Sequence, residues 1–147
     1  MEQLLKSDAS LDVLNEHQRT PLHLASENGK LDASHFLFDH GSDINSRDKD
    51  GFIPLHSASL NGHIAIVQLL VDCGADVNTS NEDRWTPLHL ASSSKGQLDT
   101  AKLLIDHGSN VDSRNDKQET PLDIASSFGY LDVLRFLIDS GAVVDGA

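Results

Sequence analysis

The side chains that could do chemistry in this 147-residue chain are eight histidines, one cysteine, and 23 aspartates and glutamates. A structural zinc site needs cysteine and histidine ligands at close spacing. Here Cys73 has no second cysteine beside it, and His23, His56 and His89 lie 33 residues apart. Histidines that recur at one long period indicate a repeated structural contact. We therefore predict no metal site and no cofactor, and we assign these three histidines a structural role.

The acidic residues also recur in phase, as Asp32, Asp99 and Asp132 do. A catalytic pair of carboxylates would be a local, unrepeated feature of a cleft. The sequence contains no nucleophile elbow, phosphate-binding loop or HExxH motif. The repeated acidic positions indicate a solvated helix face, and we predict that the chain is not an enzyme.

The amino-acid composition of the chain limits the classes of partner that can be expected. The net charge of −12 argues against binding to a nucleic-acid backbone, which needs a surface rich in lysine and arginine. No apolar run approaches the ~18 residues that a membrane helix needs, and the N-terminus lacks the apolar stretch of a signal peptide. One cysteine cannot form an intramolecular disulfide, which favours a reducing compartment. We expect an intracellular protein, cytoplasmic or nuclear, with no nucleic-acid or membrane partner.

An internal repeat organises the chain. All four prolines, Pro21, Pro54, Pro87 and Pro121, occupy equivalent places that are 33, 33 and 34 residues apart. Thr20 before Pro21 is a preferred helix N-cap, and proline suits the first helical position. Two series of glycines keep the same period: Gly29, Gly62, Gly96 and Gly129, and Gly41, Gly74, Gly108 and Gly141. Such a period is typical of solenoid proteins.

Each repeat is predicted to contain two short helices. In the first complete copy they run from Pro21 to about Asn28 and from about Leu31 to His40, and a glycine closes each one. The second helix is apolar on nearly every side except one stripe, which predicts a neighbour on both sides. Helices this short are not stable alone, so adjacent repeats must bury them. The segments between repeats carry turn residues and are predicted to form extended, hairpin-like loops.

The sequence Thr-Pro-Leu-His-Leu-Ala at 20–25 and 86–91 resembles the ankyrin-repeat signature, and Gly-Ala-Asp-Val-Asn at 74–78 resembles that family's closing motif. The resemblance covers residues 15–147. It implies an all-α ankyrin-repeat solenoid of helix-turn-helix repeats with projecting β-hairpin loops. We expect one domain, 1–147, made of a half repeat at 1–14 and repeats at 15–47, 48–80, 81–114 and 115–147.

Some positions depart from the family pattern. The signature histidine implies a hydrogen bond between repeats, and the last repeat has Asp123 in its place. Ile53 replaces the capping threonine of the second repeat, so its first helix is expected to lack a side-chain cap. Gly51 matches the family's turn glycine, and other residues hold this place in the remaining repeats: Gln18, Arg84 and Gln118.

The resemblance implies a binding surface made of hairpin tips and the exposed ends of the first helices. Phe52 and Trp85 share one hairpin position, and Leu60 and Phe128 fall in the neighbouring helix-end positions. Exposed aromatic residues are typical of binding hot spots, although Trp85 could instead pack onto its own hairpin. Basic residues also concentrate in the hairpins. The predicted partner-binding residues are Arg19, Arg47, Lys49, Phe52, Leu60, Trp85, Arg114 and Phe128.

These features predict a monomeric protein–protein interaction scaffold that binds a protein or peptide through hairpin tips and concave helix ends. Two alternatives stay open. The last repeat keeps an internal-looking second helix, with Val133, Phe136, Leu137 and Ile138, so its open end could self-associate in a structural array. The chain could also be the regulatory ankyrin region of a larger multidomain protein.

Overall fold

The computed structural model describes residues 14–95 and 97–144, which form eight α-helices and no β-strand. The half repeat predicted at 1–14 lies outside this part of the chain except for Leu14. The helices are α2 (Pro21–Glu27), α3 (Leu31–Asp39), α4 (Pro54–Asn61), α5 (Ile64–Asp72), α6 (Pro87–Ser92), α7 (Leu98–Asp106), α8 (Pro121–Phe128) and α9 (Leu131–Asp139).

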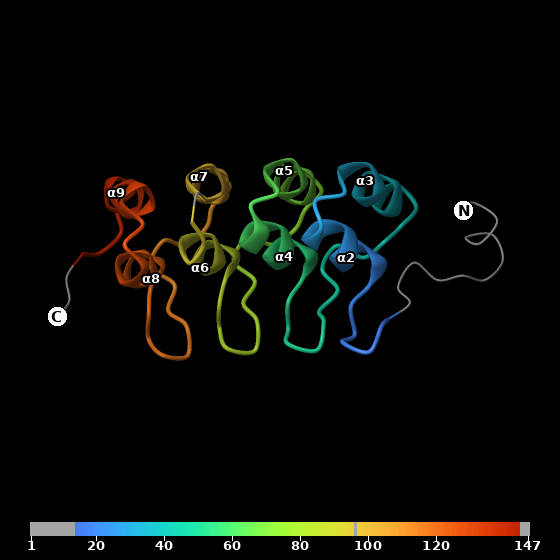
Figure 1. Ribbon diagram of the computed structural model, residues 1–147, viewed down its shortest axis with the longest axis horizontal. Helices are drawn as coiled ribbons and strands as arrows, with labels where there is room; N and C mark the ends of the chain where they lie inside the picture. The colour runs from blue at the N-terminus through green and yellow to red at the C-terminus, as the bar shows by residue number, and fades with distance from the viewer. Residues whose placement is uncertain (1–13, 96, 145–147) are drawn as a thin grey trace.

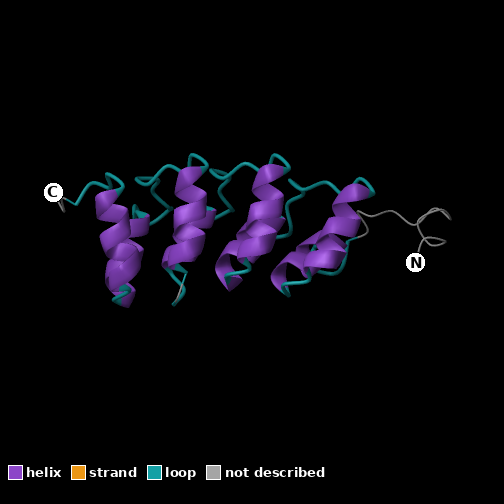
Figure 2. Ribbon diagram, turned by 90° about the horizontal axis from the view of Figure 1, so that it is seen from above, coloured by secondary structure: helices purple, strands orange, loops and turns teal. Residues whose placement is uncertain are grey.

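The helices lie in two rows. Figure 1 shows α2, α4, α6 and α8 side by side in an inner row, with α3, α5, α7 and α9 in an outer row above them. The loops between repeats project from the inner row, away from the outer one. Seen from above, the helix pairs follow one another along the long axis (Figure 2). This arrangement is the all-helical solenoid that the repeat and the family resemblance predicted.

Local chemistry explains where the inner helices begin. The Oγ1 atoms of Thr20, Thr86 and Thr120 accept backbone N–H bonds from the residue three positions later, at 3.2, 3.3 and 3.2 Å. These bonds satisfy one of the donors that a helix N-terminus leaves unpaired. As predicted, α4 has no side-chain cap at Ile53. The Ile53 backbone N–H still donates to Nδ1 of His56, at 3.0 Å.

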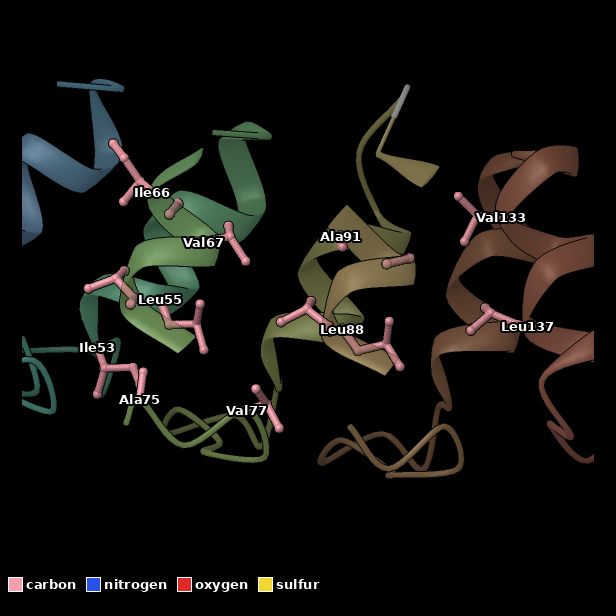
Figure 3. Packing of buried hydrophobic residues seen from close by; sticks show 14 of the residues in the cluster. Ile53, Leu55, Ile66, Val67, Ala75, Val77, Leu88, Ala91, Val133 and Leu137 are labelled. Atoms are coloured by element: carbon pink, nitrogen blue, oxygen red, sulfur yellow. The ribbon is translucent and has the colours of Figure 1, made fainter. Parts of the chain in front are cut away.

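The core is an aliphatic layer that continues from repeat to repeat. Leu55 and Leu88 occupy equivalent places in adjacent inner helices, and both are fully buried (Figure 3). Leu70 and Leu104 bring the outer row into the same layer and are also fully buried. No repeat can bury its own layer alone, so stability depends on stacking.

The outer helices are less covered than the sequence suggested. Helix α5 buries Ile66, Val67 and Leu70, but α3 buries only Ser34. Ile64, at the start of α5, is 40% exposed. The outer helices pack on the inner row and on their neighbours in the outer row, and their remaining side faces solvent. The apolar positions there exceed what the neighbours can cover.

The projecting loops reverse as hairpins, but the expected β-hairpins are wrong in one respect, since no strand forms within residues 14–95 and 97–144. Backbone bonds inside each hairpin are confined to its tip, as between Asp48 N–H and the Phe52 carbonyl at 2.8 Å. A further bond joins neighbouring hairpins, as from Glu82 N–H to the Asp50 carbonyl at 3.0 Å. These bonds are too few for a strand ladder.

The turn position of each hairpin has a left-handed backbone. Gly51 has φ +84°, and the residues that replace it, Gln18, Arg84 and Gln118, have φ of +60°, +63° and +66°. Residues with a Cβ adopt this conformation at a cost. The equivalence of these four positions, inferred from the family's turn glycine, is therefore confirmed in the backbone.

Candidate functional site

The four hairpin tips form one row along the solenoid (Figure 1). We call this the hairpin row and define it as residues 15–19, 48–52, 81–85 and 115–119. Adjacent tips are joined by backbone bonds from Lys49 to His17, from Glu82 to Asp50 and from Asp116 to Asp83, at 2.9, 3.0 and 3.0 Å. The same position of each repeat therefore lines one continuous surface.

Buried histidines hold the hairpin row against the inner helices. His23 Nε2 lies 2.7 Å from the Phe52 carbonyl, His56 Nε2 lies 3.1 Å from the Trp85 carbonyl, and His89 Nε2 lies 2.9 Å from the Glu119 carbonyl. We call these three contacts the histidine bridges. They are the inter-repeat hydrogen bonds that the family resemblance implied.

The second ring nitrogen fixes the tautomer of each bridge. Nδ1 accepts the backbone N–H of the N-cap residue, at 3.1 Å in His23, 3.0 Å in His56 and 3.1 Å in His89. The proton therefore sits on Nε2, which donates to the carbonyl of the next repeat. Asp123 reproduces only the first half of this arrangement, since its Oδ2 accepts the Thr120 N–H at 3.0 Å.

Burial keeps the bridging histidines neutral. Loss of solvation lowers the pKa of His56 from 6.5 to about 4, against the opposing effect of the Trp85 carbonyl. Burial likewise lowers the pKa of His23 and of His89. A neutral imidazole has one donor and one acceptor nitrogen, which is what each bridge requires.

Phe52 and Trp85 are the last residues of their hairpin tips and occupy the same position in adjacent repeats. Each ring is half-buried and rests on the histidine of its own inner helix. The ring centroids are 5.3 Å apart for Phe52 and His56, and 5.6 Å apart for Trp85 and His89. Both rings therefore pack onto the molecule on one side and remain partly exposed to solvent.

The other two apolar candidates do not join this pair. Leu60 is half-buried near the end of α4. Phe128 ends α8, is 55% exposed and stacks on Tyr130 at 5.6 Å. Helix α6 lies between α4 and α8 (Figure 1), so Leu60 and Phe128 are separate features and not one patch.

The basic candidates are largely used within the molecule. Arg19 pairs with Glu27 and, through Nε at 3.2 Å, with Asp48. Arg47 donates from one guanidinium nitrogen to the Gly51 and Ser80 carbonyls, at 3.2 and 2.8 Å. Arg19 and Arg47 thus brace neighbouring hairpins to one another.

The last two basic candidates are exposed. Arg114 donates to the carbonyl of Gln118 at 2.7 Å, inside its own hairpin. Lys49 is exposed at a hairpin tip, and its backbone N–H, rather than its side chain, makes the bond to the preceding hairpin.

One recurring residue that shapes the surface was not singled out in the sequence. The hairpins open with Asn15, Asp48, Asn81 and Asn115, and the Oδ1 of each accepts the backbone N–H of the residues two and four positions later. These side chains fix the tips. Their spacing of 33, 33 and 34 residues is the signal that could have identified them.

No group of three or more His, Cys, Asp or Glu side chains among the described residues is placed to hold a metal ion. Cys73 is half-buried, and burial raises the pKa of its thiol. Among the helices described, none is long and apolar enough to span a bilayer.

Comparison with known protein families identifies the family to which the chain belongs. The family model for ankyrin repeats, which represents three copies, matches residues 1–81 and 55–146. A search of curated proteins returned no match. The matched ranges cover nearly the whole sequence and include every histidine bridge. The chain belongs to the ankyrin-repeat family.

Proposed function

We propose that this chain is a binding module that holds a protein or peptide partner on its hairpin row and the adjoining ends of the inner helices. Ankyrin repeats generally mediate protein–protein interactions, and their family is typically non-enzymatic. The observation that carries the proposal is the pair Phe52 and Trp85, half-exposed rings in one position of adjacent repeats.

Rigidity supports this assignment. The histidine bridges fix the backbone carbonyls of Phe52 and Trp85 against the inner helices, and both rings rest on histidine side chains. A surface that is ordered before binding loses little conformational entropy when the partner arrives. Mixed charges surround the rings, with Lys49, Asp50 and Glu82 exposed at the tips. An apolar centre with a polar rim suits a protein partner.

Affinity capture from a cell lysate tests the proposal. We expect the Phe52→Glu/Trp85→Glu variant to lose the protein that the native chain retains, because both anchors become charged. Hot-spot residues contribute at least about 2 kcal/mol each, roughly thirtyfold in Kd. Retention would be measured by quantitative mass spectrometry, with circular dichroism to establish that each bait is folded.

The matched control for this capture is Leu31→Glu/Ile64→Glu. These exposed residues begin the outer helices α3 and α5, again in one position of adjacent repeats. The control introduces the same charge in the outer row of helices and is expected to retain the partner. Equal retention by both variants would show that the two aromatic rings are not the anchors.

A second candidate function, end-to-end assembly, is favoured by the last repeat. In α9, Leu131 is 51% exposed, against 40% for the equivalent Ile64 of α5, and Ile138 is 41% exposed where the equivalent Val71 is half-buried. Phe136 does not belong to that end, because its ring lies 5.8 Å from Nζ of Lys102 in α7. At the first described repeat, Leu24 is 39% exposed beside an apolar hollow of about 750 Å³.

Light scattering coupled to gel filtration tests assembly. If the ends stack, the apparent mass should rise with protein concentration, and Leu131→Glu/Ile138→Glu should hold it at the monomer value. The charged side chains would then be buried without partners, which is costly. A mass that stays monomeric at every concentration contradicts assembly and leaves the binding module unaffected.

A further inference from the structure

The position directly before each tip of the hairpin row differs between repeats in a way that leaves space. Arg47, Ser80 and Arg114 are equivalent residues of three successive hairpins. Arg47 and Arg114 each donate to the carbonyl four residues later, at 3.2 and 2.7 Å. The Ser80 side chain is too short to make the equivalent hydrogen bond. A hollow of about 200 Å³ lies there, between the third and fourth hairpins.

The hollow is polar and free of carboxylates. Two guanidinium groups, one amide and three hydroxyls line it: Asn78, Ser80, Arg84, Thr86, Ser113 and Arg114. This composition is unusual in a chain with 23 acidic residues, 11 basic ones and a net charge of −12. Asp83 and Asp116 are exposed at the same tips, but neither lines the hollow. The local charge is therefore opposite to that of the whole molecule.

The two arginines retain donors for a ligand. Arg19, for comparison, is neutralised by Glu27 and Asp48. Within the described residues, Arg84 and Arg114 have no carboxylate within ion-pair distance. Arg114 uses one guanidinium nitrogen for the Gln118 carbonyl, which leaves its other N–H groups available. Guanidinium groups bind carboxylates and phosphates through charge-assisted hydrogen bonds.

We propose that this hollow is a subsite for an anionic side chain of the partner, a carboxylate or a phosphate. Arg84 and Arg114 supply the positive charge, and the Ser80 and Ser113 hydroxyls supply further hydrogen bonds. The hollow has room for several water molecules at about 30 Å³ each, so either group fits. Trp85 directly follows Arg84, so a partner segment with an apolar and an acidic residue close together would engage both. The inference rests on the proposed binding module and specifies part of its partner.

Short peptides test the subsite without the natural partner. The probes are three alanine pentapeptides with acetylated and amidated ends, whose central residue is phosphoserine, glutamate or serine. Each is titrated at low salt into the full ¹⁵N-labelled chain, and backbone amide shifts are recorded by NMR. We expect saturable shifts at Ser80, Arg84 and Arg114 with the charged peptides and none with the serine peptide. Tighter binding of the phosphoserine peptide would identify a phosphate as the preferred group, and tighter binding of the glutamate peptide would identify a carboxylate.

Two variants with the same change in charge decide the outcome. Arg84→Gln/Arg114→Gln should weaken binding by about tenfold or more, since each charge-assisted bond contributes on that scale. Lys30→Gln/Arg135→Gln removes two exposed charges elsewhere and should leave binding unchanged. The proposal is wrong if both variants weaken binding equally, or if the charged peptides cause no saturable shift at the hollow. Neither result bears on the proposed binding module, because the capture experiment with Phe52 and Trp85 tests that module independently.

Discussion

Acidification from pH 7 to pH 4 is expected to destabilise the folded solenoid, with His56 alone contributing about 3 kcal/mol. Burial lowers the pKa of His56 from 6.5 to about 4, and each unit corresponds to about 1.36 kcal/mol. Between these two values the unfolded chain binds more protons than the folded one. Stability is therefore present above pH 6.5 and is lost as the pH falls toward 4. His23 and His89, whose pKa values are also lowered, act in the same direction.

Urea denaturation followed by circular dichroism at pH 7, 6, 5 and 4 measures this loss. The control is His56→Asn, which does not titrate and whose side chain can still accept the Ile53 N–H, as Asp123 does in the last repeat. We expect this variant to be less stable at pH 7, because the bridge to Trp85 is gone, but to lose less stability on acidification. The same dependence on pH in both proteins would show that His56 is not responsible.

Two opposite substitutions, made at the equivalent turn position of different hairpins, are expected to have opposite effects on stability. Gly51→Ala should destabilise the fold by about 2 kcal/mol or more, because an L-residue is disfavoured at φ +84°. Its Cβ would also lie 2.9 Å from the backbone nitrogen of Glu82 in the next hairpin. That hairpin is held in place by the bond from Glu82 to the Asp50 carbonyl, so neither side can move freely.

Gln118→Gly is the reciprocal change. Gln118 adopts φ +66° in the last hairpin, and glycine relieves this strain at some entropic cost in the unfolded chain. We expect a gain of about 0.5 kcal/mol. Denaturation midpoints of the two variants and the native chain measure both effects. If both substitutions were destabilising, the turn position would not be governed by the left-handed backbone.

The repeated features of the fold could be predicted because each is encoded locally and then recurs. Thr20 before Pro21 identifies a helix start wherever the pair occurs, and the recurrence of His23 at the same period identifies the bridges. The helix bounds follow within a residue or so of the expected ones. The missing β-strands could not be predicted in this way, because turn residues indicate a reversal of the chain and not how many bonds join its arms.

The candidate site was harder to predict because its side chains meet across repeats. Arg19 was expected to face a partner, but Asp48, 29 residues away, takes up its charge. Asp48 itself is buried. Phe136 was placed on the open end, whereas it lies beside Lys102 of the preceding repeat. Such contacts depend on how neighbouring repeats are rotated, which no local pattern specifies.

Each repeat contains two kinds of position. Recurring positions, held by capping threonines in three repeats and by bridging histidines in three, build a rigid row of hairpins. The positions beside them vary from repeat to repeat, as in the series Arg19, Phe52, Trp85 and Glu119. Specificity for a partner would arise from these variable positions, since the capping threonines and bridging histidines are buried and hydrogen-bonded within the solenoid.

Site-specific photo-crosslinking is the most direct test of where the partner binds. A benzophenone side chain would replace Asp50 or Asp83 at exposed hairpin tips, or Asp99 or Asp132 on the outer helices α7 and α9. After irradiation in a lysate, we expect the partner to be linked to the chain from Asp50 and Asp83 and not from Asp99 and Asp132. Crosslinks from the outer-helix positions alone would contradict the hairpin row as the binding surface.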